Sequence, residues 1–152
     1  MSVSSIGNGV PIDAAFSYTA GTQNYDIYLT NGYVNRALNN CYNFECITFH
    51  ESTHRYDSST LGGTIGEVNA IMRTAYECPA WNNASLDFIQ TQASYAAQKL
   101  NSYVREKNIP VPQNAIQNLN GAFVGYAKFE INNNKVSALN VLKEVEIWGE
   151  KH

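Results

Sequence analysis

The amino-acid sequence predicts an α+β fold, in which a small sheet is followed by several helices. Residues 25–30 alternate between apolar and more polar side chains and precede Asn31-Gly32, a pattern typical of a strand that enters a tight turn. Residues 64–78 and 86–104 instead repeat apolar side chains at helical spacing. A chain of 152 residues, 44% hydrophobic and 15% charged, is typical of one globular domain, which we place over residues 1–152.

The first residues are predicted to be irregular, because residues 1–24 are rich in Gly, Ser, Asn and Thr. At most one short strand is expected there, around residues 14–18. Residues 1–20 lack a basic start followed by an apolar core, so no signal peptide is predicted. The chain also lacks a run of about 18 apolar residues, and no membrane span is predicted.

Three helices are expected in the middle of the chain. The first should begin near Asn43 as N-cap and end around Tyr56, because residues 57–63 are loop formers. The second should start at Thr64 and end at Pro79. The third, over residues 86–104, shows the clearest periodicity and should pack as core, with Ser85 as its cap.

The C-terminal part is predicted to alternate between irregular and regular segments. Residues 106–120 contain two prolines and are expected to be a connector. Residues 122–131 should form a strand that ends in the turn of residues 132–134. Residues 137–148 suit a final helix by their apolar spacing, although their end would equally suit a strand.

The net charge, the composition and the cysteine content bear on the binding partners, the localisation and the redox state of the chain. A net charge of −3 argues against nucleic acid or an anionic membrane as partner. The composition, rich in Asn, Tyr and Ser, resembles that of extracytoplasmic bacterial domains, and a secreted or delivered domain is the expectation that this resemblance implies. The three cysteines are compatible with one disulfide and a free thiol, or with three thiols.

The pattern with the most chemical meaning is His-Glu-Ser-Thr-His at residues 50–54. Residues four apart share one face of a helix, so the imidazoles of His50 and His54 can bind one zinc ion. Glu51 would then face a zinc-activated water and act as its base. This is the arrangement that a metalloprotease uses.

A catalytic zinc ion takes three protein ligands, so a third must come from elsewhere. Glu67 is the expected one, because the Gly62-Gly63 bend allows the next helix to return its carboxylate to the site. The alternative is that residues 64–67 form a capping box, in which Glu67 only bonds back to the Thr64 backbone. Asp57 lies on the helical face of His50 and is expected to orient an imidazole.

Two other functions compete with the enzyme. A structural zinc ion could be held by Cys41, Cys46, His50 and His54. A zinc finger, however, needs a longer segment between its cysteine pair and its histidine pair. The same helix could also carry no metal and belong to a protein-interaction module. A non-catalytic zinc-binding or protein-interaction module is therefore the alternative to the enzyme.

The motif at residues 50–54, followed by Gly-Glu-Val-Asn-Ala at residues 66–70, resembles the zincin superfamily in its gluzincin form. Its short spacing is similar to that of small bacterial zincin-like domains, including those that end Rhs-type polymorphic toxins. The resemblance covers about residues 44–78. Thermolysin-like enzymes carry an aspartate four residues after the glutamate ligand, where this chain has Ile71, so Asp57 or a backbone carbonyl must orient the imidazoles.

The resemblance implies a minimal zincin-like domain that binds Zn²⁺ and acts as a zinc-dependent endopeptidase on a protein or peptide. A toxin of this kind would be paired with an inhibitor or immunity protein. In zinc peptidases a strand before the metal helix often lies along the cleft, and residues 25–30 are the expected strand. An extended substrate would pair with its free edge, so unstructured chains should be the preferred substrates.

Overall fold

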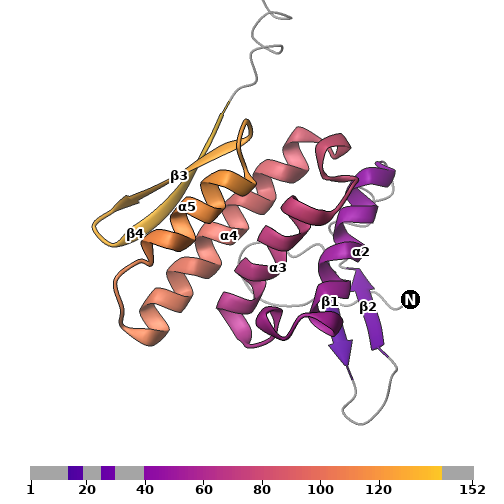
Figure 1. Ribbon diagram of the computed structural model, residues 1–152, viewed down its shortest axis with the longest axis horizontal. Coiled ribbons are helices and arrows are strands. Elements are labelled where there is room, and N and C mark those ends of the chain that lie inside the picture. The colour runs from indigo at the N-terminus through magenta and orange to yellow at the C-terminus, as the bar shows by residue number, and fades with distance from the viewer. Residues whose placement is uncertain (1–13, 19–24, 30–39, 142–152) are drawn as a thin grey trace, which may run out of the picture. The chain divides into compact units, whose positions relative to one another are not determined.

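The computed structural model describes residues 14–18, 25–29 and 40–141, the first two segments as backbone only. These residues form an α+β fold, as the sequence predicts (Figure 1). The chain divides into two compact units, residues 1–85 and residues 86–152. No helix in the described part of the chain is long and apolar enough to cross a membrane.

The first unit contains a hairpin of two short strands. Strand β1 (Ala14–Tyr18) pairs antiparallel with β2 (Tyr25–Leu29), with Phe16 opposite Ile27. Both strands lie where the sequence predicts them. Strand β1 packs along helix α2, which is described next, whereas the expected turn at Asn31-Gly32 lies outside the described residues.

Helix α2 (Cys41–Tyr56) starts earlier than expected. Its N-cap is Asn40, whose side chain accepts hydrogen bonds from the backbone N–H groups of Tyr42 and Asn43. Asn43 lies inside the helix and is 1% exposed. Its side-chain amide bonds the hydroxyl and backbone N–H of Ser85, at 3.0 and 2.8 Å, so the prediction of Asn43 as N-cap is wrong by one turn.

Two elements follow α2 within the same unit. The 3₁₀ turn η1 (Ser58–Thr60) leads into helix α3 (Gly63–Glu77), and both pack on α2. Gly62 and Gly63 have φ of +99° and +74°, a left-handed backbone that side chains disfavour, which explains the glycine pair at this reversal. A second 3₁₀ turn, η2 (Trp81–Asn83), ends the unit near Ser85.

The second unit packs two helices against a hairpin. Helix α4 (Leu86–Lys107) is the predicted third helix, and it contacts strands β3 (Ala127–Asn132) and β4 (Lys135–Asn140). Helix α5 (Gln113–Ala122) also packs on β3. The face of α4 that the periodicity selects is buried, including Phe88, Ile89, Ala93, Ala96, Leu100 and Val104.

Three predictions for this unit differ from the structure, the first being the strand expected over residues 122–131, which begins only at Ala127. Residues 106–120 are not only a connector, because α5 starts directly after Pro112. A proline disrupts a helix when it lies in the interior, and it is tolerated at the start. The expected helix from residue 137 is instead strand β4 as far as Asn140, and residues 142–152 lie outside the described part. Asn133 and Asn134 have φ of +52° and +56°, which suits the tight turn of a hairpin.

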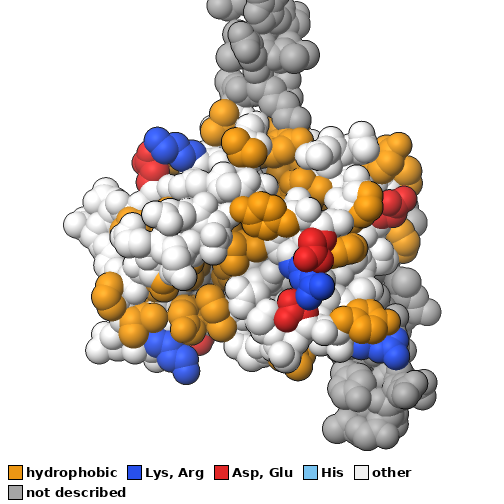
Figure 2. Space-filling model, in the orientation of Figure 1, with side chains coloured by type: hydrophobic (Ala, Val, Ile, Leu, Met, Phe, Trp, Pro, Cys, Tyr) orange, Lys and Arg blue, Asp and Glu red, His pale blue; other side chains and the backbone are white. Residues whose placement is uncertain are grey.

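The surface carries few charges on the face shown in Figure 2, where acidic and basic side chains are scattered. Among the described residues, no histidine side chain shows on that face. This agrees with the burial of His50 and His54, which are 8% and 7% exposed.

Candidate metal centre

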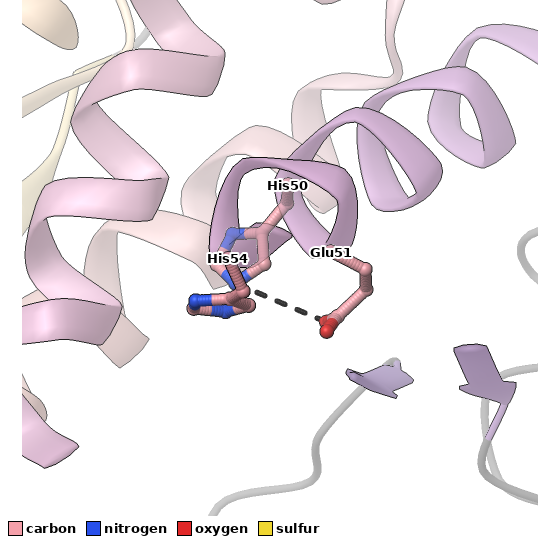
Figure 3. A group of neighbouring side chains, drawn as sticks. All are labelled: His50, Glu51 and His54. Atoms are coloured by element: carbon pink, nitrogen blue, oxygen red, sulfur yellow. Dashed lines mark ion pairs between the residues drawn. The ribbon is translucent and has the colours of Figure 1, made fainter. Parts of the chain in front are cut away.

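Helix α2 brings together the three side chains of its central motif (Figure 3). The potential ligand atoms of His50, Glu51 and His54 all lie within 4.8 Å of one another, and all three residues are buried. The two imidazole rings are 5.2 Å apart between centroids and meet at 78°. Helical spacing alone produces this arrangement, because residues at positions i and i+4 share a face.

Glu67 approaches the same point from α3. Its carboxylate oxygens lie 3.2 Å from Nε2 of His50 and 3.1 Å from Nε2 of His54. Burial raises the pKa of the Glu67 carboxyl, but hydrogen bonds and the charges of His50 and His54 outweigh this and hold the pKa well below its usual range. The carboxylate oxygens of Glu67 thus face both imidazoles, one oxygen at each Nε2.

The helix start bears on the capping-box alternative for Glu67. A capping box would place Thr64 at the N-cap, whereas the N-cap of α3 is Gly62, which has no side-chain hydrogen bond. Thr64 lies inside the helix, and the carboxylate of Glu67 is directed at His50 and His54. The structure thus brings Glu67 to the histidines.

A backbone carbonyl orients the second imidazole. Nδ1 of His54 donates a hydrogen bond to the carbonyl oxygen of Thr60, 2.9 Å away, because a carbonyl can only accept. This bond holds the ring with Nε2 toward Glu67. Sequence reasoning leaves Asp57 and a backbone carbonyl as the candidates for this role, and the described contacts place a carbonyl there.

Asp57 supports the turn that provides this carbonyl. Its carboxylate accepts hydrogen bonds from the backbone N–H and hydroxyl of Ser59, at 2.9 and 2.7 Å, and pairs with Arg73 at 2.6 Å. These bonds to Ser59 and Arg73 hold the pKa of the Asp57 carboxyl below its ordinary value. Asp57 thus caps η1, and we propose that it orients His54 through Thr60.

Three further residues determine where η1 lies, and no role at the site is predicted for them from the sequence. The hydroxyl of Thr60 donates to the carbonyls of Thr53 and Asp57, at 3.0 and 2.7 Å. Asn69 on α3 donates from its side chain to the carbonyl of Ser59 at 2.8 Å. A Cβ atom on Gly66 would lie 2.8 Å from the carbonyl carbon of Thr60 and closer to its oxygen. A glycine inside a helix is the sequence signal that could have pointed to this close approach.

Replacing Gly66 with alanine should displace the Thr60 carbonyl and weaken metal binding. We expect the affinity for a metal ion to fall by about 10–100-fold, the range typical of losing a group that orients a ligand. Alanine favours helix more than glycine, so helix propensity cannot cause the loss. Competition with a chromophoric chelator measures the affinity.

The matched control for this change is Gly121→Ala, at an exposed helical glycine of α5. The metal affinity of this variant should equal that of the unchanged chain. Unaltered affinity in a folded Gly66→Ala variant would show that the position of the Thr60 carbonyl has no influence on the metal site.

The cysteines take no part in this group. Among the described residues, the cluster of potential ligands contains no cysteine, and Sγ of Cys46 instead faces Sγ of Cys78 at 3.9 Å. Cys41 is exposed. These positions do not favour the alternative of a structural zinc ion held by two cysteines and two histidines.

The fold and the cluster on α2 together define a small zincin-like domain with a candidate metallopeptidase centre. Residues 6–134 match the family model described as metallopeptidase toxin 2, and the chain belongs to that family. No curated protein and no solved structure matches the chain. Family membership implies a bound metal ion and a protein substrate.

Proposed function

We propose that this domain is a zinc-dependent endopeptidase, with His50, His54 and Glu67 as metal ligands and Glu51 as general base. The observation that carries the proposal is the approach of the Glu67 carboxylate to both Nε2 atoms, at 3.2 and 3.1 Å. Two histidines and one glutamate form a ligand set that catalytic zinc sites use.

The separations of these atoms fit a zinc ion. Ligand atoms about 2.1 Å from a zinc ion at tetrahedral angles are about 3.4 Å apart, close to the distances between Glu67 and the imidazoles. Three protein ligands leave one position for water. A bound zinc ion would lower the pKa of a water molecule and polarise the scissile carbonyl.

Glu51 is the proposed general base. It is 5% exposed, and its carboxylate lies 3.9 Å from Nε2 of His50. In the proposed reaction this carboxylate accepts a proton from the attacking water and passes it to the leaving amine. Exclusion of bulk water around Glu51 strengthens its interaction with the developing charges.

The proposed biological role is that of a bacterial effector delivered to a target, since the chain belongs to a family of metallopeptidase toxins. The substrate would then be a protein of the target, and an inhibitor or immunity protein would protect the producing cell. Extended segments of the substrate are the expected cleavage sites, because a peptide bond must enter the site in an open conformation.

Removal of the metal tests the proposed function. The purified chain should contain about one zinc per molecule and cleave an unstructured polypeptide, in keeping with a single site built from Glu67 and the two histidines. Dialysis against a chelator should abolish cleavage, and added zinc should restore it. Equal cleavage by the metal-free chain would contradict the proposal, and one bound zinc without cleavage would identify a non-catalytic zinc-binding module.

A further inference from the structure

Besides the candidate metal centre, the first unit contains a pair of buried cysteines. Cys46 and Cys78 are 0% and 7% exposed, and their sulfur atoms are 3.9 Å apart. Cys46 lies on α2, one turn before His50, and Cys78 is the C-cap of α3. The two thiols thus face each other between the two helices that carry the candidate metal centre.

We propose that Cys46 and Cys78 form a disulfide in an oxidising environment, and that this bond cross-links α2 to the end of α3. The sulfur atoms must approach by about 2 Å to reach the length of a disulfide bond. The enclosed segment, residues 46–78, contains His50, Glu51, His54 and Glu67. Cys41 is exposed and stays outside the bond.

The positions of the sulfurs indicate the order of events. Of the two buried residues, Cys78 is the more exposed, at 7% against 0%, so the oxidant is expected to reach it first. Burial raises the pKa of the Cys46 thiol far above its ordinary value, and the neighbouring Cys78 adds to this. Cys46 is therefore a poor nucleophile toward reagents in solution and reacts only with the sulfur beside it.

The oxidant that balances the reaction is a small-molecule disulfide such as oxidised glutathione. The thiolate of Cys78 attacks one sulfur of that molecule and releases one thiol, which leaves a mixed disulfide on the protein. The thiolate of Cys46 then attacks the sulfur of Cys78 and releases the second thiol. The protein loses two protons and two electrons, and the small disulfide gains them as two thiols.

Such a bond should hold the two helices together during unfolding. It closes a loop of about 33 residues in the unfolded chain, and a loop of that length should raise the midpoint temperature of unfolding by roughly 10 °C. The cross-linked chain should also release zinc to a chelator more slowly, because α2 and α3 must separate to part Glu67 from the histidines.

The experiment uses the full chain with Cys41→Ser, so that only the two buried thiols remain. After equilibration with oxidised glutathione, thiols are counted in denaturant and digested peptides are weighed. We expect both thiols to disappear, a mass loss of two hydrogen atoms, and a peptide pair that joins Cys46 to Cys78. A Cys41→Ser, Cys78→Ser chain is the matched control and should show no rise in unfolding temperature.

If the control variant does not fold, the wild-type chain is treated in the same way, and its thiols and linked peptides decide the question. It should keep at most one thiol, that of the exposed Cys41, which is lost where Cys41 carries glutathione, and it should give the same linked peptides. Two remaining thiols, or glutathione attached to Cys78 without an internal bond, would overturn the proposal. These readouts need no bound zinc and no cleavage, so the proposal stands or fails separately from the proposed function.

Discussion

Replacement of Glu51 with glutamine should lower kcat/KM on an unstructured polypeptide by about 10²–10⁴-fold, the usual contribution of a general base. Glutamine has nearly the same shape but cannot accept the proton of the attacking water. The bound zinc should stay, because Glu51 is not one of the proposed ligands and lies 3.9 Å from Nε2 of His50. Cleavage assays and elemental analysis of the same preparation measure both quantities.

The control for this change is Glu45→Gln, which removes the same charge from an exposed position of the same helix. Its kcat/KM and zinc content should equal those of the unchanged chain. Full activity in a zinc-loaded Glu51→Gln chain would assign the base to another residue.

Replacement of His54 with alanine should remove most of the bound zinc and leave the chain folded. Loss of a group that merely orients a ligand costs about 10–100-fold in affinity, so loss of the ligand itself should cost more. The fold should persist, because the buried side chains include Val68, Ile71 and Leu100, whose packing needs no metal. Circular dichroism and a zinc titration measure the two effects.

Glu67→Gln is a milder change at another proposed ligand of the same site. The amide keeps the size of the side chain but removes the anionic oxygens that face both imidazoles, so zinc affinity should fall at least about tenfold. Unchanged affinity would demote Glu67 as a ligand. Wholesale unfolding of either chain on loss of zinc would instead mean that the metal is structural.

Helices α2, α3 and α4 could be predicted because their signals are local. Periodicity places α3 and α4 within a few residues, and the spacing of His50 and His54 fixes their shared face. Asn40 and Asn43 are equally good caps by sequence, and only the tertiary bond of Asn43 to Ser85 decides between them. The errors in these three predicted helices therefore lie at the helix ends.

The C-terminal strand could not be distinguished from a helix by sequence. Residues 137–142 satisfy helical spacing, but pairing with β3 and two backbone bonds between Val136 and the side chain of Asn101 favour a strand. These contacts join residues 35 positions apart, which no local pattern reports.

The support of the site escaped prediction for a different reason. The group that orients His54 is the backbone carbonyl of Thr60, and every residue has a carbonyl, so the residue type gives no signal. The place of Gly66 follows from how closely α3 approaches η1, which depends on packing.

All the candidate site residues, from His50 to Glu67, lie in one short continuous segment of the chain, joined by η1 and the glycine bend. The entropy lost when a chain brings two of its parts together grows with the length between them. Here that length is small, so pairing of α2 with α3 is sufficient to bring the imidazoles and the carboxylate together. Residues 86–152 need not be folded for this step, and the centre can assemble at the earliest stage at which these two helices meet.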